Sequence, residues 1–163
     1  MKYETGLQPS AGICSQMRSV AVKMTDCATS QGELESRQRM SKILLVMIGG
    51  AIGTACRYGL SSFIYSIKQP TFPYANLIIN VSGSFLIGLM AEMFEARSLV
   101  SPEVRVMLLT GVLGGYTTFS SFSFETFSLL RDGEIFLAAL NASASVLLGL
   151  AGVWAGIRLA QAL

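Results

Sequence analysis

The sequence predicts an all-α integral membrane protein with four transmembrane helices, the third of which is broken mid-membrane. Apolar residues make up 52% of the 163-residue chain, and charged residues only 13%. A helix needs ~20 residues to cross ~30 Å of hydrocarbon. Four apolar runs come close to that length: residues 43–67, 72–91, 106–124 and 135–157. A pair of glycines followed by a pair of threonines inside the third run predicts the break.

Residues 1–40 differ in character from the rest of the chain. They are polar, show no apolar periodicity and contain no signal-peptide core. We expect a disordered tail. Because Met40-Ser41-Lys42 directly precedes the first apolar run, a misassigned start codon is an alternative explanation for this segment. Residues 41–163 are expected to form the four-helix transmembrane domain.

The first two predicted helices, 42–67 and 74–96, each carry one unusual polar residue. In the first, Gly49 and Gly53 share a face and allow close helix contact. Arg57 lies within the same run, where a charge is costly and points to function; the alternative is a side chain that reaches back to the interface. In the second, the Asn80 amide can offer two donors to an anion or can join neighbouring helices.

The third helix is expected to begin with Ser101 as N-cap and Pro102 at its first position. Residues 114–123, which read GGYTTFSSFS, are a poor helix interior. Irregular backbone at membrane depth is tolerated only where it is buried in protein or lines a wet cavity. We therefore expect a break, with a restart capped by Thr117 or Thr118.

The restarted half-helix would direct its positive end toward the membrane centre, an arrangement that transporters use for anions. Ser120 and Ser121 add hydroxyl donors, while Phe119 and Phe122 share a face. Aromatic ring edges carry positive partial charge and can face a small anion. The alternative is a weakened helix with its phenylalanines toward lipid and its serines bonded back to carbonyls.

The fourth helix is expected over 134–161, where Asn141 and Ser145 share a face and either extend a polar stripe or hold helices together. Glu125 can pair with a hydroxyl or with Arg57, or it lies near the far interface. The central parts of helices one, two and four contain no carboxylate, which argues against a cation pathway or a proton-coupled pump. A net charge of +2 is too small to indicate nucleic acid as a partner.

With four helices both termini lie on one side, and the flanking basic residues are nearly balanced between the two sides. They are Lys42, Arg97, Arg105 and Arg158 on one side and Lys68 and Arg131 on the other. Near balance allows insertion in both orientations and antiparallel pairing. If the tail is present, Arg37 and Arg39 shift the balance toward an inside N-terminus.

Three motifs resemble the CrcB/Fluc fluoride channels: GGAIGTACRY at 49–58, NVSGSF at 80–85 and GGYTTFSSFS at 114–123. The resemblance extends in one register over roughly residues 40–163. It implies a channel domain that forms an antiparallel dual-topology homodimer in the lipid bilayer of the cell (inner) membrane. It also implies passive fluoride export that relieves fluoride toxicity, through two pores per dimer.

The resemblance also implies roles for individual residues. Phe119 and Phe122 would be the fluoride-facing rings, with Asn80, Ser120, Ser121 and Ser145 along the ion pathway. The carbonyls of Gly114 and Thr117 from both subunits would hold a structural sodium ion (Na⁺). Arg57 and Glu125 occupy motif positions. In the fourth helix the family often has Tyr four residues before Ser, and here Asn141 replaces that Tyr.

Two other classes fit less well. Small multidrug transporters also have four helices and dual topology, but they depend on a membrane-embedded Glu in the first helix, where this chain has Arg57 and no acid. A membrane enzyme would lack the usual catalytic side chains, because the chain has no histidine and no paired acids in its apolar runs. We therefore do not expect an enzyme.

Overall fold

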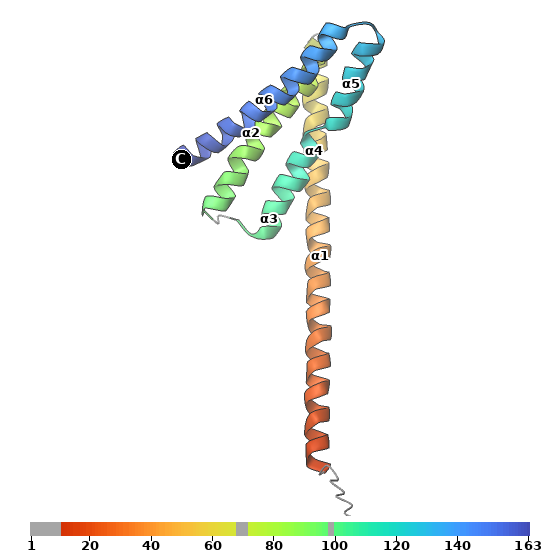
Figure 1. The fold of residues 1–163 in the computed structure, drawn as a ribbon, viewed down its shortest axis with the longest axis vertical. Coiled ribbons are helices and arrows are strands. Elements are labelled where there is room, and N and C mark those ends of the chain that lie inside the picture. The colour runs from red at the N-terminus through yellow and green to blue at the C-terminus, as the bar shows by residue number, and fades with distance from the viewer. Residues whose placement is uncertain (1–10, 68–71, 98–99) are drawn as a thin grey trace, which may run out of the picture. The chain divides into compact units, whose positions relative to one another are not determined.

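The computed structural model describes the backbone of residues 11–67, 72–97 and 100–163, and the side chains of 35–67, 72–95 and 100–163. Most of the described residues are helical, and none of them forms a strand. In chain order the helices are α1 (Ala11–Ile67), α2 (Tyr74–Arg97), α3 (Pro102–Val106), the π-helix η1 (Met107–Leu113), α4 (Gly114–Tyr116), α5 (Phe119–Arg131) and α6 (Ile135–Ala162) (Figure 1).

The chain divides into two units, Met1–Met40 and Ser41–Leu163. Helix α1 begins at Ala11, within the segment that we expected to be a disordered tail. No proline lies between residues 11 and 67, and 33–39 are mostly good helix formers, so nothing local ends the helix there. Residues 1–10, Lys68 and the side chain of Arg97 lie outside the described residues. The expected disorder of residues 1–10 and the use of Lys68 and Arg97 to judge orientation therefore stay predictions.

Among the described residues, three helices are long and apolar enough to cross a membrane: Glu35–Ile67 within α1, Tyr74–Glu95 within α2, and α6. These match three of the four predicted spans. The predicted third span is divided among α3, η1, α4 and α5, and the longest of these, α5, has 13 residues. The π-helix was not predicted.

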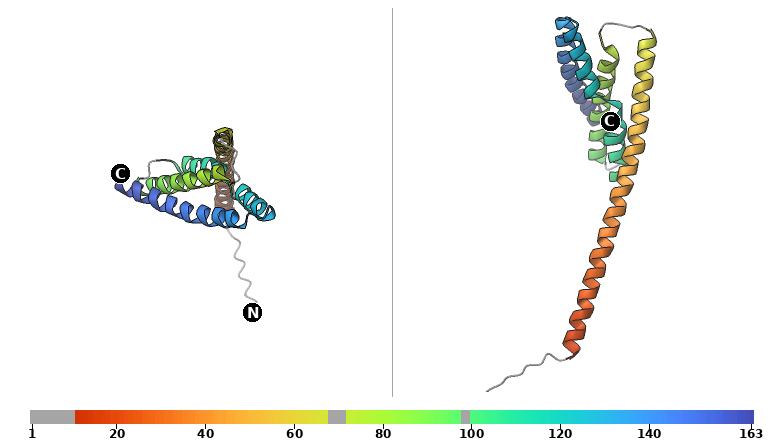
Figure 2. Two further views of the ribbon diagram at one scale, coloured as in Figure 1. Left: turned by 90° about the horizontal axis from the view of Figure 1, so that it is seen from above. Right: turned by 90° about the vertical axis from the view of Figure 1, so that its right-hand side faces the viewer.

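Helices α2 and α6 pack side by side through three glycines (Figures 1 and 2). Gly88 lies against the Val153 carbonyl of α6, and Gly156 lies against the Phe85 carbonyl of α2. A Cβ on Gly152 would meet the Val81 carbonyl at 3.0 Å. With no side chain between them the two backbones approach closely, as small residues permit in membrane helices.

A second set of glycines brings α1 against η1 and α4. A Cβ on Gly49 would lie 2.6 Å from the Met107 carbonyl, and one on Gly115 would lie 2.6 Å from the Gly50 carbonyl. Gly53 abuts the Val112 carbonyl. The predicted close contact at Gly49 and Gly53 is thus confirmed.

Much of the apolar surface of the second unit is exposed. Phe63, Phe127 and Leu150 are each more than 60% exposed, whereas Ile79 and Ala138 belong to a small buried core. Exposed apolar patches on this scale mark surfaces that contact something other than water. The pattern suits helices whose outer faces contact hydrocarbon.

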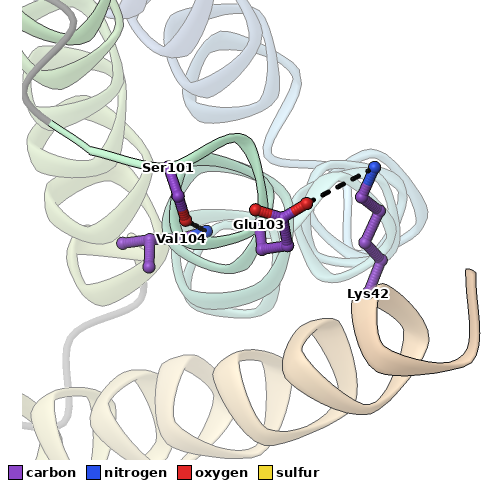
Figure 3. A network of polar contacts seen from close by, with 4 residues as sticks. All are labelled: Lys42, Ser101, Glu103 and Val104. Atoms are coloured by element: carbon purple, nitrogen blue, oxygen red, sulfur yellow. Dashed lines mark hydrogen bonds and ion pairs between the residues drawn. The ribbon is translucent and has the colours of Figure 1, made fainter. Parts of the chain in front are cut away.

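The N-terminus of α3 forms as predicted. The Ser101 hydroxyl accepts a hydrogen bond from the Val104 N–H at 3.4 Å, and Pro102 occupies the first turn. Close by, Lys42 Nζ of α1 lies 3.7 Å from Glu103 Oε1 (Figure 3). This ion pair joins the start of α3 to α1.

Candidate functional site

Two residues of extended backbone, Thr117 and Thr118, separate α4 from α5. Thr117 has φ −80° and ψ 161°, and Thr118 has φ −151° and ψ 123°. Both conformations are ordinary for extended chain and lie far from helical values. The interruption follows Gly114-Gly115-Tyr116, in the segment of lowest helix propensity.

The amide of Asn80, about two turns into α2, compensates for the missing helical hydrogen bonds. Its Oδ1 accepts from the Thr118 N–H at 2.9 Å, and its Nδ2 donates to the Thr118 carbonyl at 3.1 Å. The two partners fix the orientation of the amide, since the N–H requires an acceptor and the carbonyl a donor. Asn80 thereby satisfies both backbone groups of Thr118, which is 8% exposed.

The Thr118 hydroxyl caps the restarted helix. It accepts from the Ser121 N–H at 3.3 Å, so Thr118 is the N-cap of α5, one of the two residues expected there. It also donates to the Ser121 hydroxyl at 3.1 Å and lies 3.5 Å from that of Ser120. The two serines are therefore held close to the cap.

The same hydrogen bonds release the two carbonyls expected to bind sodium. In a continuous helix the Gly114 carbonyl would accept from the Thr118 N–H, and the Thr117 carbonyl from the Ser121 N–H. Here the first N–H is bound to Asn80 and the second to the Thr118 hydroxyl. Both carbonyls thus lose their usual donors, which fits the use of unwound carbonyls as ligands for Na⁺.

A cavity of about 360 Å³ borders the interruption. The rings of Phe119 and Phe122 lie 5.7 Å apart between centroids and are inclined by 46°. Phe119 is 79% exposed, which leaves a face of its ring free. Six of the predicted site residues line this cavity: Asn80, Gly114, Thr117, Phe119, Phe122 and Ser145.

A second cavity, of about 260 Å³, brings Arg57, Ser121 and Glu125 together. Arg57 Nε and Glu125 Oε2 are both buried and have no hydrogen-bond partner among the residues that the structure describes. Among the described residues no ion pair joins the two side chains. Ser120 lines neither of these cavities and is exposed.

Asn141 and Ser145, the two polar residues that share a face of α6, have different surroundings in the structure. Ser145 lines the first cavity, and its hydroxyl is buried without a partner. Asn141 is 1% exposed and instead donates from Nδ2 to the Thr126 hydroxyl at 2.8 Å. Of the two alternatives left open by the sequence, Asn141 therefore holds helices together.

Three residues near the site were not singled out from the sequence. Asn76, one turn before Asn80, lines the second cavity beside Glu125, and its four-residue spacing from Asn80 was a usable signal. The Tyr116 hydroxyl lies 2.9 Å from that of Ser82, which ties α4 to α2. Thr126 lies four residues after Phe122 and donates to its carbonyl at 2.8 Å.

Comparisons with known proteins place this arrangement in a family. Residues 44–157 match the family described as CrcB-like protein, Camphor Resistance (CrcB). The chain is 49% identical over 124 residues to the fluoride-specific ion channel FluC of Geobacter sulfurreducens, which covers 76% of this chain and 100% of the relative. It is 48% identical over 122 residues to FluC of Geotalea daltonii, which covers 75% and 98%.

A third relative, FluC of Rhizobium meliloti, is 45% identical over 124 residues, covering 76% of this chain and 99% of the relative. The matched region begins close to the start of the second unit and contains all three motifs, the interruption and both cavities. The chain therefore belongs to the CrcB/Fluc family of multi-pass membrane proteins.

Proposed function

We propose that this protein is a fluoride-selective channel that lets fluoride leave the cell passively and so relieves fluoride toxicity. The observation that carries the proposal is the cavity beside the interruption, which gathers a ring pair, an amide and several hydroxyls, with no carboxylate among the described residues that line it. The relatives named fluoride-specific ion channels support the same substrate.

The lining suits a small anion that gives up its water. The Phe119 and Phe122 rings can present positive edges to the ion. Asn80 uses one Nδ2 proton for the Thr118 carbonyl and keeps a second donor on the cavity side. The Ser145 hydroxyl, without a partner in this structure, adds another donor. Neutral donors bind the ion without holding it as tightly as a fixed positive charge would, which favours conduction.

The wider arrangement belongs to the same proposal. Residues 106–124 form a fourth span interrupted within the membrane, and two copies of the chain pair in opposite orientations in the inner membrane. Two pores per homodimer would then be lined by Phe, Asn and Ser or Thr groups. The open lining of the cavity and the exposed Phe119 ring in a single copy support a pathway that a second copy completes.

A structural Na⁺ at the dimer interface would be held by the Gly114 and Thr117 carbonyls of both subunits. The diverted N–H groups of Thr118 and Ser121 support this role, because they leave those oxygens free for a cation. When bound, Na⁺ would supply positive charge that draws the two interrupted helices together. Protein prepared without sodium should then show weaker fluoride flux than the same protein after sodium is restored.

Efflux from liposomes that contain the purified full-length protein tests the proposal. Fluoride should leave rapidly, and chloride, measured in the same vesicles, should stay. Equal fluxes of the two ions, or no fluoride flux, would contradict it. Crosslinking of single cysteines placed at opposite ends of α6 tests the antiparallel pairing.

A further inference from the structure

Asn141 stands apart from the candidate pathway but connects to it through two hydrogen bonds. Its Nδ2 donates to the Thr126 hydroxyl at 2.8 Å, and that hydroxyl donates to the Phe122 carbonyl at 2.8 Å. Since a hydroxyl has one proton, the Thr126 proton points to Phe122 and its lone pair faces Asn141. The order of donation along this chain is therefore fixed.

The connection joins α5 to α6 at a buried position of α6. Asn141 is 1% exposed, and Ala138, one turn earlier on α6, is 2% exposed. Most large side chains at the start of α5 are exposed, including Phe119 and Phe124. A hydrogen bond between helices in a membrane is worth about 1 kcal/mol, so one well-placed bond can fix the position of a short segment.

We infer that Asn141 is a positioning residue that holds the Phe122 ring in its place beside Phe119. Its amide acts through Thr126 and does not line the cavity itself, whereas Ser145, four residues later, does. The inference rests on the proposed fluoride pathway. It gives a role to the position where Asn141 replaces a tyrosine that the resemblance marks as common in the family.

Four full-length variants test the inference by fluoride efflux from liposomes. Asn141→Leu removes the donor at nearly constant volume, and Thr126→Val removes the hydroxyl. Both should lower maximal fluoride efflux about tenfold, the scale seen when a supporting residue behind a functional group is lost. Thr126→Ser keeps the hydroxyl and should stay close to the parent protein. Ser143→Ala is the matched control, since Ser143 is exposed on α6 and donates only within its own helix, to Ala139 and Leu140.

Hydrogen exchange of the amides in residues 119–126 provides a second readout that does not depend on flux. Asn141→Leu should speed exchange in this segment and leave α2 unchanged. If the parent transports fluoride and Asn141→Leu matches it in both flux and exchange, the inference is wrong. If Asn141→Leu does not fold, Thr126→Val against Thr126→Ser decides, and equal flux in those two overturns it.

Failure of the proposed function looks different from failure of this inference. A parent protein that passes no fluoride, or passes chloride equally well, rejects the fluoride pathway. The exchange comparison between the parent and Asn141→Leu then still decides whether Asn141 holds the start of α5.

Discussion

Asn80 makes two hydrogen bonds to a single residue, Thr118, accepting from its N–H at 2.9 Å and donating to its carbonyl at 3.1 Å. A residue within an intact helix thus replaces the partners that the interrupted helix lacks. The pairing also diverts the N–H that would otherwise occupy the Gly114 carbonyl. One side chain therefore supports the interruption, frees a candidate sodium ligand and lines the cavity.

Replacing Asn80 by Leu should destabilise the protein strongly. The change leaves the buried N–H and carbonyl of Thr118 without partners, at about 1–3 kcal/mol for each group. Thermal unfolding of the detergent-purified protein measures the loss. Ile78→Ala, two residues away on an exposed part of α2, is the control and should change the unfolding temperature little. Equal stability of Asn80→Leu and the parent would show that the pairing contributes nothing.

Replacing either ring of the Phe119–Phe122 pair by Ile should abolish fluoride flux without unfolding the protein. Isoleucine keeps the apolar bulk but lacks the positive ring edge that can face an anion. Liposome efflux measures the flux, and size-exclusion chromatography checks that the protein remains intact. Phe124→Ile is the control, because Phe124 is 70% exposed and does not line the cavity. Flux that survives both ring changes would remove the rings from the pathway.

The sequence predicts those parts of the fold that depend on short-range signals. Run length and charge placement predict α2 and α6 to within one residue at each end, and the start of α3 follows from Ser101 and Pro102. Thr117 and Thr118 are recognisable as candidate caps because they follow the weakest helical segment, and the structure shows that Thr118 is the cap. Each of these features depends on residues within about one helical turn.

The remaining features depend on contacts between distant parts of the chain. Asn80 and Thr118 are 38 residues apart, and nothing in either local sequence identifies the other as its partner. The link from Asn141 to Thr126 spans 15 residues and crosses the turn at Gly133, whose φ is +82°. The amide of Asn141 was recognised as polar, but its partner depends on how α5 packs against α6. The role of each predicted site residue in conduction stays a prediction.

Acid should weaken the contact between α1 and α3 through Glu103. The Glu103 carboxylate accepts from its own backbone N–H and from the Ser101 hydroxyl and lies beside Lys42, and these contacts hold its pKa below the ordinary value of 4.5. Because the folded state holds the proton less tightly, this contribution is complete above the ordinary pKa and is lost as pH falls through the folded pKa.

The Glu103→Gln variant tests this assignment. Unfolding temperatures of parent and variant, compared at about pH 7 and about pH 3.5, should differ more at the higher pH. Glu134→Gln is the control, since Glu134 is exposed and lies in the turn before α6. If the difference in unfolding temperature between the parent and Glu103→Gln does not change with pH, the Glu103 carboxylate is not stabilised in the folded state.

Gly53 and Gly59 should respond in opposite ways to the same change. A Cβ on Gly53 would collide with the Val112 carbonyl and lie 2.9 Å from the Tyr116 N, and backbone atoms cannot swing aside as a side-chain end can. Gly53→Ala should therefore cost about 1–3 kcal/mol and loosen α1 from η1 and α4. A Cβ on Gly59 would meet no described atom within 4 Å apart from its chain neighbours and the adjacent backbone of its own helix, so Gly59→Ala should raise helix propensity and stabilise the protein by up to about 1 kcal/mol. Thermal unfolding of both variants measures the contrast, and a stable Gly53→Ala variant would mean that α1 does not pack closely here.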